Sequence, residues 1–435
     1  MTAGYSPGPA PAGSGGGHQH HVDPDELVSL EAYRRELLGR LAPLEPLRLS
    51  LAEAHGCVLA EDVDAPADVP AHASSAMDGY AVRAGDASAG ATLLLVGEAA
   101  AGGAPTGPVG PGQAVRIMTG GVVPDGADAI VPVEVAEELP EPGDAAERVV
   151  VSVAAETGAH VRLAGEDVRA GERVLSAGRR LRPADVGMLA AVGRSRVLVH
   201  PRPRVVVIAT GDEVVEPDAA IRPGQVRDSG SYALAALARD AGATVYRHAI
   251  VRDDRRALQE AFEGALVHAD LLITCGGVSA GRYDLVKEVL VQMGDVEARK
   301  VGMQPGMPQA FGFLGAASGR RVPCFGLPGN PVSSYVSFEV LVRPSIRRLQ
   351  GRTDLHRPRV SAVLDDRLAS PTAKVSFVRV RLHREGEVWH ATSTGPQGSG
   401  ILTSLVLADG LAEVPFERTA MEPGERVVVH LLVEA

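Results

Sequence analysis

The fold is decided by a β-branched apolar run that stops in a polar loop, Val205-Val206-Val207-Ile208-Ala209-Thr210-Gly211-Asp212-Glu213. The apolar part is too short for a buried helix, and its Val and Ile side chains favour a strand. Because the run does not alternate with polar residues, both faces of the strand should be covered, as in a parallel sheet. We therefore predict a buried parallel strand whose carboxyl end carries the Thr210–Glu213 loop.

Strands and helices alternate from Arg204 to Gln350. Further strands are predicted over Ala243 to Ile250, Leu271 to Cys275, Val296 to Met303 and Val322 to Phe325, and a long helix ends at Gln350. This alternation implies a parallel sheet with helices on both faces, and such sheets bind ligands beyond the carboxyl ends of their strands. The loops TGDE (210–213), GGVSAG (276–281) and LPGNP (327–331) follow strands directly, so we expect them to converge.

Composition excludes several classes of protein. The formal net charge of -11 and the absence of a Lys/Arg-rich run argue against a nucleic-acid partner. No stretch approaches the roughly 18 apolar residues of a membrane helix. Cys57, Cys275 and Cys324 have no CxxC spacing and are expected to be reduced, buried thiols of a cytoplasmic protein.

The ends of the chain differ from its centre. Residues 1–22 are rich in Gly and Pro and should form a disordered tail, in which His18, His20 and His21 could bind a transition metal adventitiously. Helices are expected from Leu27 to Leu41 and, with an interruption near Gly56, from Leu49 to Leu59. Short β-like runs from Ala71 to about Glu156 predict a small all-β insert, and those after Gly351 predict a C-terminal β domain.

Two segments of the insert place a polar side chain beside glycine. They are SSAMDGYA at 74–81, which contains Asp78, and RIMTGG at 116–121, which contains Thr119. Glycine lets a backbone approach a ligand closely, but it also suits tight turns at the rim of a barrel. The spacing leaves both interpretations open.

Five carboxylates could gather at the strand ends of the central segment: Asp212, Glu213, Asp228, Asp253 and Asp284. Clustered carboxylates repel one another unless a cation lies between them, and hard oxygen ligands suit Mg²⁺ bridging to a phosphate. The alternative is that Asp228, Asp253 and Asp284 are helix N-caps.

Gly277-Val278-Ser279-Ala280-Gly281 lies between a predicted strand and a predicted helix and matches G-x-S-x-G. This is the context of a hydrolase nucleophile, for which His356 would be a downstream base. The same glycines suit a loop whose backbone N–H groups face an anion. No phosphate-loop, H-E-x-x-H or paired CxxC motif occurs in the chain.

Taken together, the loops resemble those of the molybdopterin molybdenumtransferase family, which includes the C-terminal domain of gephyrin. The motifs occur in the family's order and cover roughly residues 25 to 435: MDGYA (77–81), RIMTGG (116–121), GED (165–167), TGDE (210–213), GGVSAGRYD (276–284), PGMP (305–308) and LPGNPVS (327–333). Each motif alone is weak, whereas their joint occurrence is specific.

The resemblance implies a multidomain α/β plus β subunit. An elongated α/β segment would comprise 23–68 and 157–200, and an all-β insert would span 69–156. A central three-layer α/β/α parallel-sheet molybdopterin-binding domain would cover 201–351, followed by a C-terminal β domain at 352–435. The family forms homodimers with a site between subunits, and molybdoenzymes or pathway proteins are further possible partners.

The implied activity is insertion of molybdate into adenylylated molybdopterin, with Mg²⁺ or another divalent cation, giving molybdenum cofactor and AMP. Glu213 and Asp284 would hold the metal and act catalytically with Asp253. Asp78, Thr119 and Asp167 would contribute from the insert and elongated segment and face the partner subunit's Thr210 loop. The resemblance assigns substrate binding to Thr210, Gly211, Asp212, Asp228, Ser229, Gly276, Gly277, Ser279, Gln304, Met307, Pro328, Gly329, Asn330, Pro331, Lys374 and Arg379.

The chain departs from the family pattern in two places. Gln304 and Met307 stand where the family commonly has lysines, and Gly230 replaces the Asn of an Asp-Ser-Asn turn. Removing two cations weakens the attraction for molybdate unless Lys300, Arg282 or Arg299 substitutes. This departure motivates a second hypothesis, a pterin-binding scaffold or chaperone that has lost insertion activity.

Overall fold

A computed structural model describes residues 27–103, 107–139, 147–277, 285–371 and 373–433. These residues form two units. The first unit contains the described chain up to Ala42, Pro203–Leu349 and the chain from Asp354 onward, and the second contains Pro43–Arg202 and Gln350–Thr353. The predicted multidomain α/β plus β fold is confirmed, and each unit is described by itself.

A six-stranded sheet forms the centre of the first unit, in the order β17-β14-β18-β22-β21-β19. Its strands are β14 (Arg204–Ala209), β17 (Thr244–Arg247), β18 (Leu271–Cys275), β19 (Glu297–Lys300), β21 (Pro308–Gly315) and β22 (Arg321–Leu327). The strands β17, β14, β18 and β22 are parallel, whereas β21 is antiparallel to both of its neighbours. The strand β21 was not predicted, and it makes the sheet mixed rather than wholly parallel.

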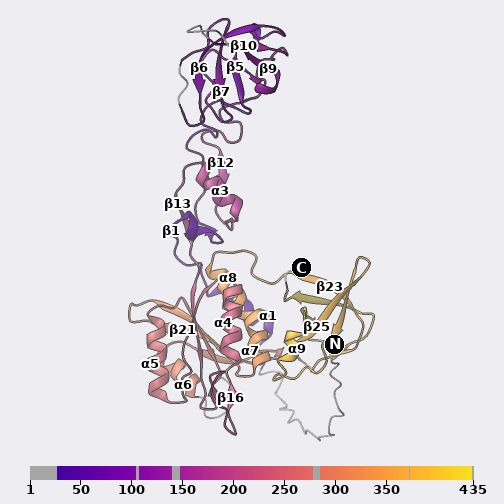
Figure 1. Ribbon diagram of the computed structural model, residues 1–435. Coiled ribbons are helices and arrows are strands. Elements are labelled where there is room, and N and C mark those ends of the chain that lie inside the picture. Colours follow the sequence, from indigo (N-terminus) through magenta and orange to yellow (C-terminus); the bar gives the residue numbers. More distant parts are fainter. Residues whose placement is uncertain (1–26, 104–106, 140–146, 278–284, 372, 434–435) are drawn as a thin grey trace. The chain divides into compact units, whose positions relative to one another are not determined.

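Helices cover both faces of this sheet (Figure 1). The helices α5 (Arg255–Leu266) and α6 (Leu285–Met293) pack on one face, where Phe262, Leu290 and Ile208 share a buried cluster. The helix α4 (Gly230–Asp240) packs on β14 and on α7 (Pro331–Ser337). The predicted long helix to Gln350 is α7, a π-helical turn η4 (Phe338–Val342) and α8 (Arg343–Leu349) in succession.

The strand order contains a reversal that fixes where a ligand can bind. From β14 the chain passes through α4 to β17 on one side, and then through α5 to β18 on the other side of β14. The helices that follow β14 and β18, α4 and α6, therefore lie on opposite faces of the sheet, which leaves a crevice at the carboxyl ends of these strands.

A closed β-barrel lies in the C-terminal part of the first unit. Its order is β25-β26-β23-β29-β27, and β27 pairs with β25 to close it. The strands are β23 (Arg359–Leu364), β25 (Val375–Glu385), β26 (Val388–Ser393), β27 (Gly410–Val414) and β29 (Arg426–Leu431). The short strand β20 (Met303–Gln304) adds to β25. The smaller elements here are α9 (Thr403–Val406), β24 (Leu368–Ala369) and β28 (Ala420–Met421).

The first helix, α1 (Leu30–Gly39), packs on α8. It begins three residues later than predicted, because Ser29 caps it and accepts a hydrogen bond from the Ala32 N–H at 3.1 Å.

The second unit contains a six-stranded sheet in the order β8-β5-β7-β6-β10-β9. Its strands are β5 (Gly79–Val82), β6 (Thr92–Ala99), β7 (Gln113–Ile117), β8 (Ala129–Pro132), β9 (Ala136–Leu139) and β10 (Arg148–Val151), with 3₁₀ turns η2 (Ala84–Asp86) and η3 (Val133–Val135). Smaller pairings connect β1 (Leu47–Ser50) and β2 (Val58–Leu59) to β13 (Arg196–His200), β3 (Val63–Asp64) to β12 (Arg173–Leu175), and β4 (Ser74–Ser75) to β11 (Val161–Arg162).

The helix predicted over Leu49 to Leu59 is wrong. The segment forms the end of β1, one short helix α2 (Leu51–Ala54) and β2. Gly56 lies between them with φ of 79°, a conformation that ends a helix. The unit also contains the helix α3 (Pro183–Ala191), which begins with a proline in its first turn.

Candidate functional site

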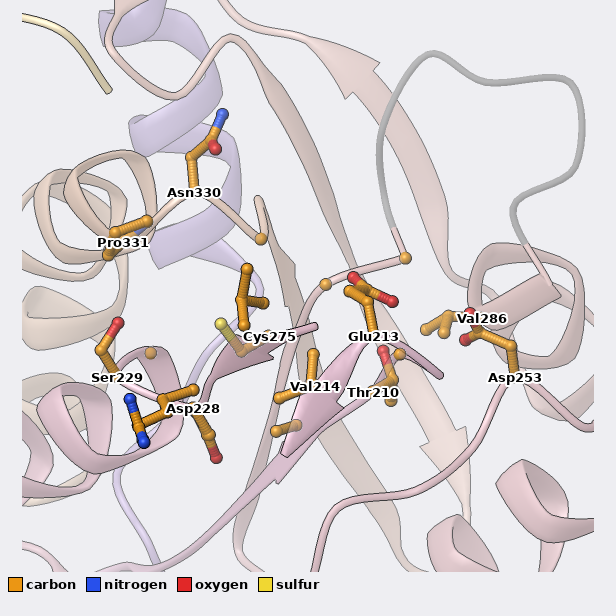
Figure 2. Close-up of a pocket in the computed structure, with 18 of the residues that line it drawn as sticks. Thr210, Glu213, Val214, Asp228, Ser229, Asp253, Cys275, Val286, Asn330 and Pro331 are labelled. Atoms are coloured by element: carbon orange, nitrogen blue, oxygen red, sulfur yellow. The ribbon is translucent and has the colours of Figure 1, made fainter. Parts of the chain in front are cut away.

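A cavity of about 1080 Å³ opens at the carboxyl ends of β14 and β18. In Figure 2, Thr210, Glu213 and Asp253 lie on one side of it and Ser229 and Pro331 on the other. The described residues that line it are Ala209, Thr210, Gly211, Glu213, Val214, Val226, Arg227, Asp228, Ser229, Gly230, Asp253, Cys275, Gly276, Gly277, Leu285, Val286, Glu288, Gly329, Asn330, Pro331 and Gly400. The three loops expected to converge therefore border one cavity.

The loop after β14 depends on a glycine. Gly211 has φ of 138°, and a Cβ atom placed there would lie 2.7 Å from Glu213 Oε2. Only glycine therefore allows the Glu213 carboxylate to fold back beside its own loop. The same loop is held by the Gly211 N–H, which donates to the Val251 carbonyl at 3.2 Å.

The loops after β14, β18 and β22 are joined through their backbones. The Thr210 N–H donates to the Cys275 carbonyl at 3.2 Å, and the Gly276 N–H donates to the Leu327 carbonyl at 3.1 Å. Gly276 has φ of 104°, and a Cβ atom there would lie 2.8 Å from the Thr210 carbonyl oxygen. The cavity floor is thus close-packed backbone, which leaves no space for larger residues.

Two threonine hydroxyls, one directly after β14 and one in β18, lack partners among the described residues. Thr210 Oγ1 and Thr274 Oγ1 are buried, and neither makes a hydrogen bond within this part of the chain. An unsatisfied buried polar group costs about 1–3 kcal/mol. Such groups are expected where a bound molecule supplies the missing partner, and Thr210 itself lines the cavity.

The described lining is strongly acidic. It contains the carboxylates of Glu213, Asp228, Asp253 and Glu288, and a single basic side chain, that of Arg227. An anionic ligand would be repelled unless a cation also bound, since like charges in a partly enclosed site raise each other's energy. The donor set of carboxylate and hydroxyl oxygens fits Mg²⁺ or a similar hard cation.

Two of these carboxylates have different structural roles. Asp228 Oδ1 accepts from the Ser231 N–H at 2.9 Å and caps α4, and Arg247 Nη1 lies 3.5 Å from Asp228 Oδ2. Asp254, and not Asp253, caps α5, with the Ala257 N–H donating to it at 2.9 Å. The N-cap interpretation therefore describes Asp228 and fails for Asp253, which lines the cavity.

The thiol of Cys275 also lines the cavity. Burial raises the pKa of Cys275 to about 12. The group is therefore a neutral thiol near neutral pH, unlike the low-pKa thiolate of a nucleophilic cysteine.

Some of the predicted residues lie just outside the lining. Asp212 is exposed and accepts a hydrogen bond from the Asp253 N–H at 3.3 Å. Pro328 is buried beside Gly329, and its carbonyl lies 3.9 Å from the Cys275 thiol. Ser279 and Asp284 lie outside the described residues, so their roles stay predictions.

Gln304, Met307, Lys374 and Arg379 are not among the lining residues. Gln304 is exposed in β20, and partial burial lowers the pKa of Lys374. Lys300 is half-buried in β19. Arg299 forms ion pairs with Glu297 at 2.6 Å and with Glu36 at 3.0 Å, so its charge is already partnered. Arg282 lies outside the described residues.

Arg379 supports the cavity from the barrel. Its side chain is 1% exposed, and burial lowers its pKa to about 10. It donates to Ser404 Oγ at 3.0 Å and to the Gly398 carbonyl at 3.2 Å. These bonds hold the segment that carries Gly400, a lining residue, and the Val332 N–H of α7 donates to Ser399 in the same segment at 3.1 Å.

The second unit brings two of its predicted site residues together. Asp78 Oδ1 accepts from the Thr119 N–H at 2.6 Å and from the Thr119 hydroxyl at 2.7 Å. These two hydrogen bonds hold the pKa of Asp78 below its usual value. Asp167 is exposed, and its N–H donates to the Val69 carbonyl at 3.1 Å.

The sequence did not single out several lining residues. Arg227 and Val226 lie in β16 (Val226–Arg227), which pairs with β15 (Val214–Val215) at the edge of the cavity. Their position beside Asp228 was a usable signal. Gly400 comes from the barrel, and no local pattern could have placed it here.

The hydrolase interpretation gains no support from the described residues. Its base, His356, does not line the cavity. Burial, together with the nearby Arg34 and Arg359, lowers the pKa of His356 to about 4.

Comparison with known proteins identifies the family. Three family models match in succession: "MoeA N-terminal region (domain I and II)" at residues 28–193, "Probable molybdopterin binding domain" at 206–348, and "MoeA C-terminal region (domain IV)" at 361–432. Molybdopterin molybdenumtransferase 2 of Mycobacterium tuberculosis is 42% identical over 416 residues, covering 93% of this chain and 99% of that protein. The chain belongs to the molybdopterin molybdenumtransferase family.

Other members of the molybdopterin molybdenumtransferase family match more than nine-tenths of the chain. The Haemophilus influenzae protein of that name is 34% identical over 415 residues, covering 93% of this chain and 100% of its own. A crystal structure of a molybdopterin biosynthesis MoeA protein from Pyrococcus horikosii superimposes with a TM-score of 0.76 at 30% identity, covering 94% of this chain and 100% of that one. The resemblance inferred from the seven motifs is thereby confirmed.

No helix in the described part of the chain is long and apolar enough to cross a bilayer.

Proposed function

We propose that this protein inserts molybdate into adenylylated molybdopterin, releasing AMP and forming molybdenum cofactor. The observation that carries the proposal is the acidic, glycine-floored cavity at the strand-order reversal between β14 and β18. Nucleotide-like ligands bind at this position in doubly wound sheets. Membership of a family named for molybdenum transfer to molybdopterin supplies the identity of the ligand.

The glycine loops suit the phosphate-bearing part of such a substrate. Gly211, Gly276 and Gly277 have positive φ, so their backbones can approach a ligand without side chains in the way. Thr210 Oγ1 would gain the hydrogen-bond partner that none of the described residues supplies. The N-terminus of α4, bordered by Ser229 and Gly230, adds a favourable dipole for an anion.

A divalent cation such as Mg²⁺ would be held by Glu213 together with Asp284, and would offset the charge of the phosphates. Asp253 lines the same cavity and Asp212 bonds to its backbone, so both would support Glu213. This role explains why an acidic lining is compatible with an anionic substrate.

We further infer that the protein acts as a homodimer in which Asp78, Thr119 and Asp167 of one subunit serve the Glu213 site of the other. The hydrogen-bonded pair of Asp78 and Thr119 fits a shared functional turn. Mixing inactive Asp78→Ala and Glu213→Ala proteins under conditions of subunit exchange should restore roughly a quarter of wild-type activity, because half of the dimers are mixed and each has one intact site. Activity no greater than that of either variant alone would rule out sharing.

The activity is tested by measuring AMP release from adenylylated molybdopterin with and without molybdate and Mg²⁺. The wild-type protein should release AMP only in the complete mixture, and Glu213→Ala should reduce the rate at least a hundredfold. Glu263→Ala, an exposed carboxylate on α5 outside the cavity lining, is the matched control and should leave the rate unchanged. Wild-type rates in Glu213→Ala would contradict the assignment.

A second candidate function is a pterin-binding scaffold or chaperone without insertion activity. It is favoured by the neutral side chains of Gln304 and Met307 at positions where the family commonly has lysines. Under this alternative the wild-type protein binds the pterin without turnover, and Gln304→Lys combined with Met307→Lys raises molybdate-dependent AMP release. If the wild-type protein already releases AMP and the double variant does not release it faster, the scaffold alternative fails.

The substrates and the three free, buried cysteines fit a cytoplasmic protein. If the protein forms molybdenum cofactor, the molybdoenzymes that accept the cofactor would be partners of this protein.

A further inference from the structure

Two histidines and an aspartate meet on the C-terminal barrel, among residues that do not line the cavity. His383 in β25 and His390 in β26 are directly opposite each other in the antiparallel register. Asp365 immediately follows β23, and its N–H donates to the Ala391 carbonyl at 3.1 Å. The three side chains are thus placed by backbone pairing of three adjacent strands.

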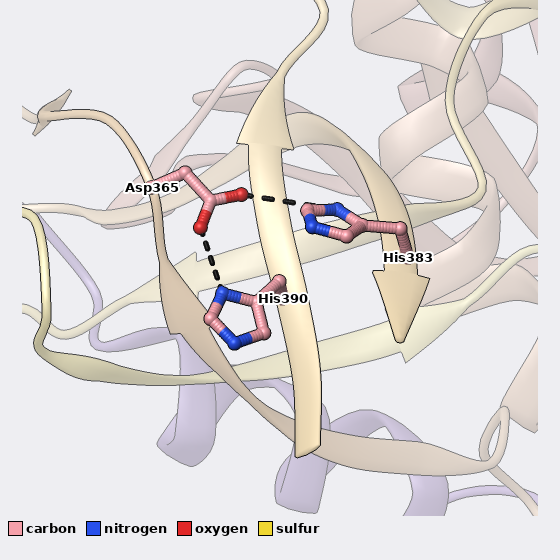
Figure 3. Close-up of side chains that lie close together, drawn as sticks. All are labelled: Asp365, His383 and His390. Carbon is pink, nitrogen blue, oxygen red and sulfur yellow. Dashed lines mark hydrogen bonds and ion pairs between the residues drawn. The ribbon is translucent and has the colours of Figure 1, made fainter. Parts of the chain in front are cut away.

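One carboxylate oxygen of Asp365 faces each of the two imidazole rings (Figure 3). Its Oδ1 is 2.8 Å from His390 Nδ1, and its Oδ2 is 3.8 Å from His383 Nδ1. One potential ligand atom from each of the three residues lies within 4.8 Å of the others. Ligand atoms bound tetrahedrally to Zn²⁺ at 2.0–2.2 Å are about 3.4 Å apart. Small side-chain rotations would bring the three ligand atoms to this separation.

A second carboxylate faces the opposite nitrogens of the same rings. Glu385 Oε1 is 3.5 Å from His383 Nε2, and Glu385 Oε2 is 3.7 Å from His390 Nε2. Metal-bound imidazoles usually donate their other N–H group to a carboxylate, which fixes the tautomer and the ring orientation. Glu385 occupies the position of such an outer partner for both rings.

A hydroxyl group outside the proposed ligand set also holds the Asp365 carboxylate. The Thr392 hydroxyl donates to Asp365 Oδ2 at 2.7 Å. The carboxylate is therefore oriented before any cation binds, which reduces the entropy lost on binding.

The donor atoms of this group favour a transition metal. Two imidazoles and the Asp365 carboxylate supply nitrogen and oxygen ligands, and the two ring centroids are 5.3 Å apart. Mixed nitrogen and oxygen ligands suit Zn²⁺, Ni²⁺ or Cu²⁺ better than Mg²⁺, which prefers oxygen alone.

We propose that Asp365, His383 and His390 form a transition-metal site on the barrel surface that takes Zn²⁺, with Glu385 supporting the two imidazoles. The His383 and His390 side chains are 49% and 17% exposed, so the site is open to solvent and to entering metal. This proposal concerns the C-terminal barrel and does not depend on the proposed molybdenum chemistry.

Binding is tested by titrating the full-length, metal-free protein with Zn²⁺ in a calorimeter. The tail histidines could bind metal themselves, so the reference protein carries His18→Ala, His20→Ala and His21→Ala. It should bind about one Zn²⁺ per chain, and Mg²⁺ at the same concentration should not compete. In this background His383→Ala and Asp365→Asn should each weaken binding at least tenfold, and Thr392→Val should weaken it less.

His268→Ala, an exposed histidine outside the cluster, is the matched control and should leave Zn²⁺ affinity unchanged. Co²⁺ gives a second readout, because its visible absorption bands report imidazole coordination directly and should disappear in His390→Ala. Thermal melting controls for misfolding of the variant, because the reference protein and His383→Ala should have the same melting temperature without metal. Zn²⁺ should raise the melting temperature of the reference protein but not that of His383→Ala. Absence of Zn²⁺ binding in the tail-substituted protein, or undiminished binding by His383→Ala, would overturn the proposal.

Discussion

The carboxylate of Asp78 accepts two hydrogen bonds from Thr119, a residue 41 positions further along the chain. The two residues lie in the glycine-bearing turns that the sequence singled out as unusual. Because Thr119 supplies both its N–H and its hydroxyl, the orientation of the carboxylate is fixed although the group is exposed.

Removing one of these bonds should separate function from stability. Thr119→Val keeps the backbone donor but deletes the hydroxyl, so the pKa of Asp78 should rise towards its ordinary value of about 3.9, measurable by NMR titration. AMP release should fall about tenfold because the carboxylate loses a fixed orientation, while the melting temperature should not change. Asp125→Asn, an exposed carboxylate in the same unit, is the control. Full activity in both Thr119→Val and Asp78→Asn would remove this turn from the site.

The second prediction concerns the glycine beneath Glu213. Gly211→Ala should cost about 1–2 kcal/mol of unfolding free energy because of its positive φ, and should also displace the carboxylate, which a Cβ atom would approach to 2.7 Å. Gly224→Ala also places alanine at a positive φ, 85°, but its Cβ atom meets no atom within 4 Å. Denaturant unfolding should therefore show a loss of stability in both variants, while AMP release drops only in Gly211→Ala. Equal activity in the two variants would mean that the position of Glu213 is unimportant.

The third prediction concerns a buried ion-pair network in the helix after the cavity. Glu339, in η4, binds Arg343 through Nε at 2.6 Å and Arg357 through Nη2 at 3.0 Å. Burial alone would raise the pKa of Glu339, but the bonds from Arg357 and Arg343 outweigh it and lower the pKa. Glu339→Gln should cost about 3–5 kcal/mol, because two buried guanidinium groups lose their countercharge.

The same network should shape acid unfolding. Because the pKa of Glu339 is lower in the folded state, its stabilisation is present above the unfolded value of about 4.3 and is lost as pH falls through the folded value. At pH values below about 4.3, the denaturant midpoint should decrease with falling pH more steeply in wild type than in Glu339→Gln. The exposed pair of Arg256 and Glu260 has the same four-residue spacing, and Glu260→Gln should leave both stability and pH dependence unchanged. Parallel pH profiles for wild type and Glu339→Gln would contradict this account.

The fourth prediction explains why glycine stands at position 230. A Cβ atom there would lie 2.6 Å from the Cys275 sulfur, and both residues are buried. Gly230→Ala should therefore destabilise the protein by about 1–3 kcal/mol, and adding Cys275→Ala should recover much of the loss. Gly264→Ala is the control: a methyl group on this helical glycine of α5 would have no atom within 4 Å, so alanine should be neutral or stabilising. Strictly additive effects at positions 230 and 275 would show that the two residues are not coupled.

The sequence predicted the parts of the fold that rest on local pattern. The run from Val205 to Ala209 consists almost entirely of β-branched residues, and it lies in β14 as predicted. Its loop borders the cavity because parallel topology brings strand ends together. The antiparallel strand β21 was missed because Gly312 and Gly315 dilute its apolar pattern and Pro308 begins it. Its assignment depends on pairing with β22, which no local window contains.

Long-range contacts account for the remaining gaps in the candidate site. Gly400 reaches the cavity from the barrel because Arg379 and α7 hold its segment there. The sequence offered Asp253 as an alternative N-cap of α5, whereas Asp254 is the cap, because adjacent aspartates satisfy the same sequence rule. The close approach of Gly230 to Cys275 could not be predicted from either motif, since the two residues are 45 positions apart and the constraint is purely steric.

The central claim is that the cavity at the ends of β14 and β18 holds the substrate. The most direct test is a crystal structure of the slow Glu213→Gln variant grown with adenylylated molybdopterin and Mg²⁺. We predict that the phosphate-bearing part of the ligand lies against Thr210 and Gly276, with Thr210 Oγ1 making the hydrogen bond that no described residue offers it. Ligand density elsewhere on the protein, with this cavity filled by solvent alone, would contradict the account.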